Sequence, residues 1–463
     1  MREHFDFYGY NGPHSGKYYM DKVETYTMGT DYRTVGRFKE YKNVGFNISL
    51  LQHENTYNGE KWEGSACKKC MDAAYKAGID KIIVSDGRLK ALCEEKKLVG
   101  EGGKFATEEE LENYIRDCCA PYCNYPGFYG VQLFDEPEFG KLKEYAHTYR
   151  AIKKVFPDMA VQCNLLNLCA PHMLAEKPSD KYEDYANYLE YFAKESGIDY
   201  LMTDEYAFRR NNIISSYTLP TYQILVKKCQ ELGLELRLVM QSFSQEGAAL
   251  YNGQLHGGVA WRRMTEKDMY WQMNLAMGFG CKEFSFFTYF TKQHKNFIGM
   301  RSASCGIDGA NFINLDGTRT KLYYYTKRII GEMIAFEKTL VKYNFDSAYF
   351  FFPKGKTAAD YEQTKEAFLK DGCPIQVKTA KSPVIVTELK NGANRMFMVE
   401  NIGNTIDELL YGQRASKVEI DLGEFASKAK FFVRGKQVCR ETVEGLLTEK
   451  MHCGDAIFIE IEG

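Results

Sequence analysis

Polar, helix-like stretches that end at glycine alternate with short apolar runs along most of the chain. In KAGIDKIIVSDG (residues 76–87) and ESGIDYLMTDEY (195–206), two or three residues follow the glycine before the apolar run begins. A glycine just past a helix supplies the left-handed cap, and four to six apolar residues after it are typical of a strand buried on both faces. Each such unit is therefore predicted to be a helix-to-strand step of a parallel sheet.

Eight strands and eight helices are predicted before residue 343. The strands lie at 5–10, within 43–54 and 76–87, at 129–134 and 160–166, and within 195–206, 231–242 and 278–289. The helices lie at 32–43, 64–76, 108–119, 141–155, 182–194, 219–231, 266–277 and 320–341. This alternation predicts the α/β class and a (β/α)₈ TIM barrel. A doubly wound open sheet is the competing architecture, but no glycine-rich phosphate loop follows the first strand.

The hydrophobic pattern changes after residue 343. Short apolar runs separated by turn residues replace the alternation, as in SPVIVTELKNGANRMFMVEN (382–401), where NGAN is predicted to be a hairpin turn. Such a pattern is typical of an antiparallel sandwich. We therefore predict a barrel domain over residues 1–343, followed by a small antiparallel β-sandwich domain over residues 344–463.

Composition and charge restrict the class of partner. The chain has 463 residues, a formal net charge of −2 and a pI near 6.5, and its basic residues are scattered. Nucleic acid or an anionic membrane would need a basic cluster, so small neutral partners are favoured. The N-terminus has no apolar run of signal-peptide length, and no segment approaches the roughly 20 apolar residues of a membrane span. A soluble, cytoplasmic protein is expected, and the sequence does not indicate an oligomeric state.

The 14 cysteines are spread through predicted helices and strands of a chain that is long enough to build a large core. They are therefore predicted to be reduced thiols that pack as small hydrophobic groups. Cys67 and Cys70 have the one spacing that could hold zinc. Because they lie within a helical pattern without a second CxxC or a paired histidine motif, helix packing is favoured over a metal site.

Charged and polar side chains follow the predicted strands. They are His53, Glu54, Asp86, Arg88, Asp135, Glu136, Asn167, Asp204, Glu205, Gln241, Thr288 and Tyr289. The carboxyl ends of barrel strands converge on one face, so we expect these residues on one rim, where barrel enzymes carry out catalysis. A single polar residue after a strand can simply mark the chain reaching water. Two adjacent Asp-Glu pairs and a further Asp at the same end weaken that interpretation.

Several carboxyl groups on one rim favour glycoside hydrolysis. This reaction needs one protonated carboxyl group to supply the leaving oxygen and one ionised carboxylate to act as nucleophile or base. Aromatic residues for sugar stacking follow the strands as well: Trp62, Trp261, Tyr206 and Tyr289. No cofactor is expected, and a metal-dependent hydrolase is disfavoured because the eight histidines are not clustered.

The ordered series of motifs resembles the barrel glycoside hydrolases related to clan A, and within them a bacterial group with D-E-P at the end of strand 4. The resemblance rests on GFYGVQLFDEPEF (127–139), YLMTDEYAF (200–208) and LDGTRTKLYYYTKRI (315–329), and it covers most of the chain. It implies that Glu136 matches the strand-4 acid/base and that Asp204 matches an aspartate usual at the end of strand 6. Carbohydrate is the substrate that it implies.

One position departs from this family. Clan A enzymes carry their nucleophilic glutamate at the end of strand 7, where this chain has Gln241, and Glu246 lies five residues later. Three interpretations stay open. Asp204 or Glu205 takes the second role from strand 6, or Asp135 assists a substrate 2-acetamido group, or the barrel binds carbohydrate without cleaving it. The binding residues expected around any of these sites are His53, Trp62, Asp86, Arg88, Asn167, Tyr206, Gln241, Trp261 and Tyr289.

Overall fold

The structure is a computed structural model of the chain. It describes residues 3–20, 23–27, 30–209, 214–244, 249–251, 254–256, 261–291, 311–357, 360, 372–405 and 415–463. Glu246, one of the carboxylates considered for the site, lies outside these residues.

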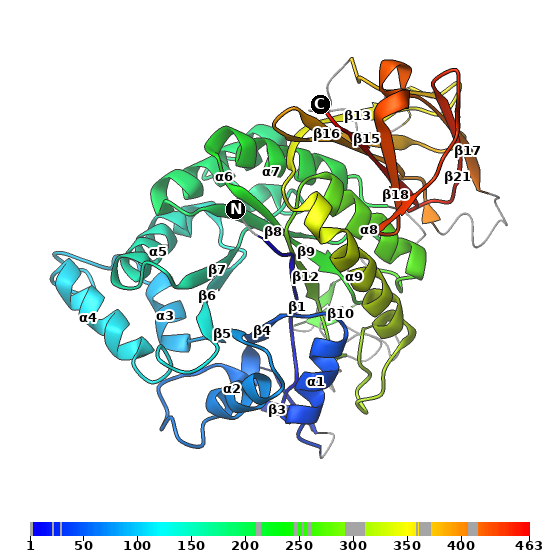
Figure 1. Cartoon of the computed structure of the whole chain (residues 1–463). Helices are drawn as coiled ribbons and strands as arrows, with labels where there is room; N and C mark the ends of the chain where they lie inside the picture. The colour runs from blue at the N-terminus through cyan, green and yellow to red at the C-terminus, as the bar shows by residue number, and fades with distance from the viewer. Residues whose placement is uncertain are drawn as a thin grey trace.

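Eight parallel strands form a closed barrel, as Figure 1 shows. In barrel order they are β1 (Asp6–Gly9), β4 (Ile48–Leu51), β5 (Lys81–Ser85), β6 (Phe128–Asp135), β7 (Ala160–Asn164), β8 (Tyr200–Glu205), β9 (Glu235–Gln241) and β12 (Glu283–Phe287). All eight are apolar runs followed by polar residues, which explains why the hydrophobic pattern predicted them. The predicted (β/α)₈ barrel is confirmed.

The barrel consists of two four-stranded halves, β4-β5-β6-β7 and β8-β9-β12-β1. Within each half, neighbouring strands pair over four or more residues, for example Tyr200 to Glu205 of β8 against β9. Between β7 and β8 the backbone pairing is a single bridge from Leu165 to Thr203. Between β4 and β1, the N–H of Asn47 donates to the carbonyl of Phe7 at 3.0 Å. The two junctions are thus held by fewer backbone bonds than the halves.

Helices surround the barrel (Figure 1). They are α1 (Val35–Asn43), α2 (Ala66–Lys76), α3 (Gly87–Cys93), α4 (Glu108–Cys119), α5 (Leu142–Val155), α6 (Lys181–Ser196), α7 (Thr218–Leu232), α8 (Glu266–Gly278) and α9 (Lys321–Leu340). Eight of them match the predicted helices, and α3 is an additional short helix directly after β5. Gly197 and Gly233, just past α6 and α7, adopt the left-handed cap with φ of 67° and 70°.

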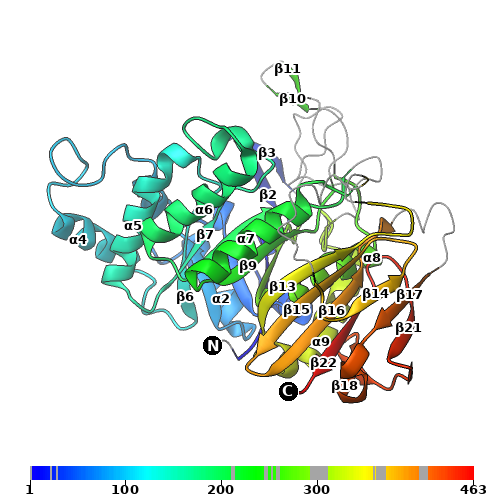
Figure 2. The same cartoon turned by 90° about the horizontal axis from the view of Figure 1, so that it is seen from above.

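Two hairpins stand at the carboxyl end of the barrel strands. One pairs β2 (Lys17–Met20) with β3 (Val23–Thr27) in the segment after β1, and the other pairs β10 (Ala249–Tyr251) with β11 (Gln254–His256) after β9. Figure 2 shows both on the same side of the molecule. The sequence pattern did not predict them, because each strand is short and polar residues interrupt it.

The C-terminal part is a sandwich of two antiparallel sheets. One sheet has the order β13 (Asn344–Phe351), β15 (Val384–Asn391), β16 (Asn394–Asn401), β22 (Ala456–Ile461), β18 (Ala429–Val433) and β19 (Lys436–Val438). The other has the order β14 (Gln376–Thr379), β17 (Ser416–Asp421), β21 (Leu446–Met451) and β20 (Thr442–Val443). Side chains such as Phe397, Ile420 and Leu447 fill the space between the sheets. The β15–β16 hairpin turns at the predicted NGAN, and the sandwich is confirmed.

The sandwich packs against α8 and α9 of the barrel (Figure 2). Gly278 at the end of α8 allows this approach, because a Cβ at this position would lie 2.4 Å from the Met398 methyl group on β16. The Tyr343 hydroxyl group donates to Glu460 on β22 at 2.7 Å. Because α9 ends at Leu340 and β13 starts at Asn344, little chain separates the two parts. Whether residues 1–343 and 344–463 fold as separate domains stays a prediction.

A buried ion pair stabilises the start of α8. Arg262 donates two hydrogen bonds to Asp268, at 2.5 and 2.8 Å, and Asp268 is completely buried. Asp268 also closes a capping box with Thr265 and accepts a hydrogen bond from Thr405, which belongs to the C-terminal part. This carboxylate therefore connects the segment after β9, helix α8 and the sandwich.

Replacing Asp268 with alanine is expected to lower the free energy of unfolding by about 3 to 5 kcal/mol, because Arg262 would remain as a buried charge without its partner. Urea denaturation followed by circular dichroism measures this difference. The control is Asp117→Ala, which removes an exposed carboxylate from α4 and should change the free energy of unfolding by less than about 0.5 kcal/mol. Equal effects of the two changes would contradict the prediction.

The cysteines and the helices give two further observations. Thirteen cysteines are free thiols, and Cys305 lies outside the described residues. Cys67 and Cys70 are buried in α2, and within the described ranges no group of three or more His, Cys, Asp or Glu side chains is arranged to hold a metal ion. In the same ranges, none of the helices has the length and apolar character needed to cross a membrane.

Candidate active site

Carboxyl groups from two strands meet at the carboxyl end of the barrel, around the side chain of Asn164 on β7. The Asn164 amide nitrogen donates to Asp135 Oδ1 at 2.9 Å and to Asp204 Oδ1 at 3.3 Å. The Asp204 carboxylate in turn forms a hydrogen bond with the Glu136 carboxyl group. Since β6, β7 and β8 are neighbours in the barrel, their ends place Asp135, Glu136 and Asp204 in one cluster.

Glu136 is held in an unusual backbone conformation. Its φ is +49°, in the left-handed region that residues with a Cβ adopt at a cost of roughly 1 to 2 kcal/mol. Its N–H still donates to the Asn164 carbonyl at 2.9 Å, and Pro137 then prevents β6 from continuing. Backbone conformations of this kind cluster at functional sites. The two carboxylates at the end of an apolar strand therefore mark a sharp turn that brings Glu136 to Asp204.

The hydrogen-bonded pair, Glu136 and Asp204, carries one proton near neutral pH. The charge on Asp204 is the largest cause that raises the pKa of Glu136, and burial and the charge on Asp135 raise it further. Burial and the charge on Asp135 also raise the pKa of Asp204, while three hydrogen bonds to its oxygens lower it. Because two like charges in contact cannot both ionise readily, the proton resides on Glu136 and Asp204 is the anion.

The three carboxyl groups differ in their access to solvent. Asp135 and Glu136 expose more than a third of their surface, although enough protein surrounds them for burial to raise the pKa of each. Asp204 is only 4% exposed. A molecule that arrives from solvent therefore meets the proton of Glu136 and the carboxylate of Asp135, with Asp204 behind them.

Lys90 on α3 is a cation whose charge reaches this cluster. Its positive charge lowers the pKa of Asp135 and so opposes the effect of burial, while burial lowers the pKa of Lys90 itself. The Lys90 ammonium group donates to Gln132 on β6 at 2.9 Å. This partly buried lysine therefore favours the ionised form of Asp135, the second accessible carboxyl group.

Aromatic side chains lie beside the carboxyl groups. The Tyr206 hydroxyl group is hydrogen-bonded to Asp204, and its ring stacks on Phe287 at a centroid distance of 5.8 Å. Trp261 meets Tyr206 edge to face at 5.9 Å, and Phe243 packs against both rings. Tyr206 and Trp261 are each partly exposed. The Arg209 guanidinium lies over the Trp261 ring at 5.0 Å, so the group is an aromatic cluster with partly exposed edges beside the carboxyl groups.

Glu205 does not join the cluster, because successive side chains of a strand point to opposite faces. Asp204 points into the barrel, so Glu205 points outward to α7, where it accepts a hydrogen bond from Thr218 at 2.8 Å. Burial raises the pKa of Glu205 to about 7, and the charge on Arg209 opposes this shift. The structure therefore separates Glu205 from Glu136, although its charge lies close enough to Asp204 to interact with it.

Asp86, which is buried, and Arg88, which is partly exposed, form a structural ion pair. Asp86 caps α3 by accepting from the N–H of Arg88 at 2.8 Å, and its second oxygen accepts from the Arg88 guanidinium at 2.6 Å. The Tyr122 hydroxyl group also donates to Asp86, at 2.9 Å, and the carboxylate is completely buried. With every partner supplied by the protein, these two residues stabilise the start of α3 and do not lie with the carboxyl cluster.

Gln241 and Tyr289 are both buried. The Gln241 side chain accepts from the N–H of Phe208 at 2.9 Å and donates to backbone carbonyls, including that of Phe243 at 3.2 Å. Tyr289 packs between Tyr41 and Phe312, with no exposed surface. The end of strand 7 therefore holds an amide that connects loops, and Tyr289 belongs to the core.

The remaining predicted binding residues lie around the rim. His53 is exposed in the 3₁₀ turn His53–Asn55 after β4. Trp62 packs edge to face on Tyr57 at 5.3 Å and is partly exposed. Asn167 donates to the carbonyl of Asp204 at 2.7 Å and so fixes the backbone that carries this carboxylate.

Three residues near the cluster were not predicted from the sequence: Asn164, Lys90 and Tyr10. Asn164 lies within a predicted strand. A polar residue among its apolar neighbours was the feature that could have indicated it. Tyr10 ends the first strand and is buried beside Asp135 and Asp204, whose charges raise its pKa after the larger effect of burial. Lys90 gave no signal, because the sequence did not predict α3.

Glu136 is expected to stay protonated at neutral pH. A carboxyl group whose pKa is raised in the folded protein binds its proton until the pH rises through that pKa, so stability declines as the pH rises above the ordinary value of 4.5. Infrared spectroscopy of protein labelled with ¹³C at glutamate detects the C=O stretch of the protonated group. Glu205 and Glu400, whose pKa values burial also raises, contribute to the same region, so the Glu136 band is the component at pH 7 that is lost in Glu136→Gln. If this band were lost on raising the pH with a midpoint below pH 5, the prediction would be contradicted.

No protein-family model matches the chain, and no curated protein matches it. Solved structures do. An α-amylase from Anoxybacillus, reported as giving insights into a new glycosyl hydrolase subclass, aligns with a TM-score of 0.51 and 12% identity over 100% of this chain and 98% of that chain.

Two further solved structures give lower scores. A family 5 glycoside hydrolase from Bacteroides vulgatus aligns with a TM-score of 0.49 and 9% identity, over 92% of this chain and 85% of that one. A family 39 glycoside hydrolase from Bacteroides cellulosilyticus aligns with a TM-score of 0.46 and 12% identity, over 92% of this chain and 77% of that one. At these identities the likeness concerns the fold alone. The α-amylase supports the predicted barrel followed by a β domain, while membership of the bacterial D-E-P group stays a prediction.

Proposed function

We propose that the protein is a glycoside hydrolase that cleaves a small oligosaccharide or glycoside by carboxyl acid/base catalysis. The observation that carries the proposal is the hydrogen-bonded pair at the carboxyl end of the barrel, in which Glu136 holds a proton and is exposed while Asp204 is ionised behind it. Glycoside hydrolysis requires an acid and a carboxylate in this relation.

In the proposed reaction, Glu136 is the general acid. As the bond between the anomeric carbon and the glycosidic oxygen breaks, that oxygen takes the proton of Glu136 and leaves as a hydroxyl group. The negative charge of Asp204 stabilises the positive charge that develops on the sugar ring. Water completes the hydrolysis, and its proton returns to the carboxyl pair, so the enzyme is restored.

Asp204 is proposed as the second catalytic carboxylate, and Asp135 is the alternative because it is exposed and lies beside Lys90. Small nucleophiles distinguish the two. Azide restores the cleavage of an activated glycoside when the carboxylate that attacks the sugar is replaced by alanine, so rescue of Asp204→Ala assigns the role to Asp204. Rescue of Asp135→Ala alone would transfer the role to Asp135.

The experiment that tests the function is a panel of nitrophenyl glycosides, covering common hexoses, pentoses and their 2-acetamido derivatives in both anomers. The proposal would be supported if the unaltered protein released nitrophenol and if Glu136→Gln failed to do so from glycosides with poorer leaving groups. A substrate imported into the cytoplasm is part of the same proposal. Failure to cleave any member would leave the second candidate.

The second candidate is a barrel that binds carbohydrate without cleaving it. Two observations favour it: Gln241 occupies the strand-7 position, and the Glu136 and Asp204 carboxyl groups are in hydrogen-bond contact. Paired carboxyl groups in glycosidases are about 5 to 9.5 Å apart, so a substrate would have to separate this pair. Calorimetric binding of an oligosaccharide that is recovered intact would support this candidate.

A further inference from the structure

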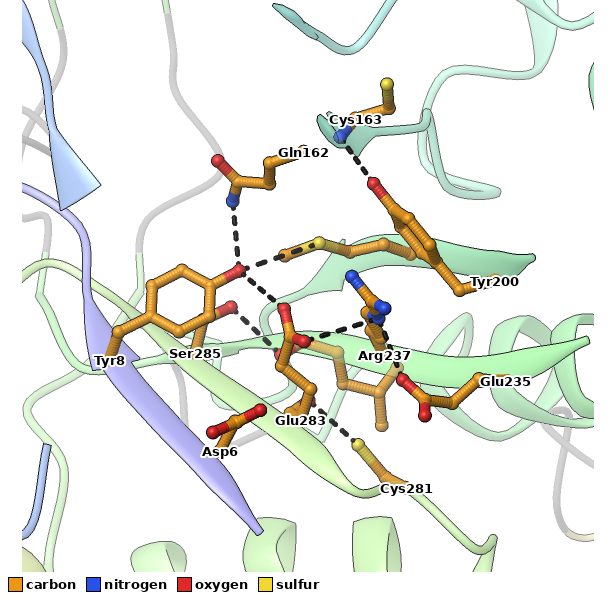
Figure 3. Close-up of polar contacts among 12 residues, drawn as sticks. Asp6, Tyr8, Gln162, Cys163, Tyr200, Glu235, Arg237, Cys281, Glu283 and Ser285 are labelled. Atoms are coloured by element: carbon orange, nitrogen blue, oxygen red, sulfur yellow. Dashed lines mark hydrogen bonds and ion pairs between the residues drawn. The ribbon is translucent and has the colours of Figure 1, made fainter. Parts of the chain in front are cut away.

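A chain of hydrogen bonds runs through the interior of the barrel and ends beneath the carboxyl cluster. The amide nitrogen of Gln162 on β7 donates to Tyr8 at 2.9 Å and to Tyr10 at 2.8 Å. Tyr8 donates to Glu283 at 3.2 Å, and Glu283 is paired with Arg237 at 3.3 Å. Figure 3 shows the part of this chain from Gln162 to Arg237. The first member, Tyr10, lies at the end of β1.

The ion pair fixes the direction of every hydrogen bond in the chain. Two acceptors lie in reach of the Tyr8 hydroxyl group, and the Glu283 carboxylate at 3.2 Å binds its single proton more strongly than the Met202 sulfur at 3.8 Å. The Tyr8 oxygen can then only accept, which requires the nitrogen of the Gln162 amide to face both tyrosines. The Tyr10 oxygen therefore accepts from Gln162 as well. Its own proton remains available, and within the described residues this hydroxyl group has no hydrogen bond to an acceptor.

Tyr10 lies close enough to the carboxyl groups for the charges of Asp135 and Asp204 to act on it. Gln162 and Asn164 are two residues apart on β7, so their side chains point to the same face, about 7 Å apart. Asn164 holds Asp135 and Asp204, while Gln162 holds Tyr10. The Tyr10 ring contacts Phe287 at a centroid distance of 6.0 Å and is 3% exposed. The titratable groups whose charge reaches its hydroxyl group are Tyr8 on β1, Asp135 on β6, and Asp204 and Tyr200 on β8.

We propose that Tyr10 is a hydrogen-bond donor at the carboxyl cluster, with Gln162 as the residue that positions it. Its proton, which has no acceptor among the described residues, faces the ionised carboxylates in the free protein without a direct hydrogen bond and donates to an oxygen of a substrate when one is bound. A buried glutamate–arginine pair and a buried glutamine are costly in a barrel core. Here these groups keep the Tyr10 hydroxyl group in one orientation, because they fix the direction of each hydrogen bond that leads to it. The substrate part of the proposal depends on the proposed function, whereas the part that concerns the carboxyl cluster does not.

The test measures the pH at which Glu136 loses its proton, by infrared spectroscopy of protein labelled at glutamate and without any substrate. Tyr10→Phe removes the donor, and Gln162→Met removes the group that orients it. Each change makes the ionised cluster less stable, so the pH midpoint of the Glu136 band should move upward by about one unit.

Tyr200→Phe is the matched control. Tyr200 is a buried barrel tyrosine whose hydroxyl group is bonded to the backbone of β7, donating to Val161 at 2.6 Å and accepting from Cys163 at 2.8 Å. This change also removes a buried hydrogen bond and should lower the melting temperature, but it should leave the midpoint unchanged. A purely structural role of Tyr10 predicts the same pattern for Tyr10→Phe and Tyr200→Phe, and that result would overturn the proposal.

A second measurement separates this proposal from the proposed function. If a glycoside is cleaved, Tyr10→Phe should lower kcat by roughly tenfold and change KM little, because a hydrogen bond that strengthens at the transition state acts on kcat. An unchanged kcat would refute the substrate part. If no glycoside is cleaved by the unaltered protein, the proposed function fails, and the infrared shift still decides the role of Tyr10 at the cluster.

Discussion

Replacing Glu136 with glutamine is expected to lower kcat by roughly 10² to 10⁴-fold on a glycoside with a poor leaving group, while the fold is kept. Glutamine has nearly the same shape as the protonated acid but cannot release a proton to the departing oxygen. A glycoside with a good leaving group, such as a dinitrophenolate, needs little protonation and should lose far less activity. Steady-state kinetics on the two substrates, with melting temperatures of both proteins, measure the effect.

The matched control for this experiment is Glu138→Gln. Glu138 lies two residues along the same turn and is exposed, so this change removes the same charge without affecting the carboxyl cluster. Its kcat should remain within about twofold of the unaltered protein on both substrates. If Glu136→Gln kept full activity on the glycoside with the poor leaving group, Glu136 would not be the acid, and Asp135 would become the next candidate.

Asp204→Asn is expected to have two effects. First, kcat should fall by roughly 10² to 10⁴-fold on good and poor leaving groups alike, because the stabilisation of positive charge on the sugar does not depend on the leaving group. Second, the pKa of Glu136 should decrease, since the charge on Asp204 is the largest cause that raises it. The glutamate infrared band should then disappear at a lower pH than in the unaltered protein.

Asp199→Asn serves as the control for Asp204, because Asp199 immediately precedes β8 at the opposite end of the barrel and is exposed. It should change neither the kinetics nor the infrared midpoint. If Asp204→Asn left the Glu136 midpoint in place, the hydrogen-bonded pair would not be the source of the raised pKa. A selective loss on poor leaving groups would instead show that Asp204 assists the acid.

The sequence was most informative where a local pattern and the global fold agree. Each barrel strand is an apolar run because helices cover one face and the barrel interior the other, and the glycine caps at Gly197 and Gly233 mark the helix ends. The short strands of the hairpins, and β21 in the sandwich, carry too few apolar residues for their periodicity to show. The hairpin strands pair with the strand next to them in the chain, whereas β21 pairs with β17 in a more distant segment, which a local pattern does not contain.

The site was less predictable, because side-chain direction matters there as well as position. Glu205 follows Asp204 in the sequence, but strand alternation sends it to the opposite face. Asp86 ends a strand as Asp135 does, yet it caps a helix that the sequence did not predict. Gln162 and Tyr8 are far apart in the sequence, and only closure of the barrel brings them together.

The division of the barrel into two half-sheets has a consequence for the spacing of Glu136 and Asp204, the proposed catalytic pair. Glu136 belongs to the half that contains β6 and β7, and Asp204 belongs to the half that starts with β8. Their hydrogen bond spans the junction where the backbone pairing is the single bridge between Leu165 and Thr203. A slight hinge-like opening there would leave every strand ladder intact while increasing the gap between the two carboxyl groups toward the about 5 to 9.5 Å of working glycosidases. If the proposed function holds, the junction would thus allow the separation of the two carboxyl groups to adjust when a sugar ring binds between them.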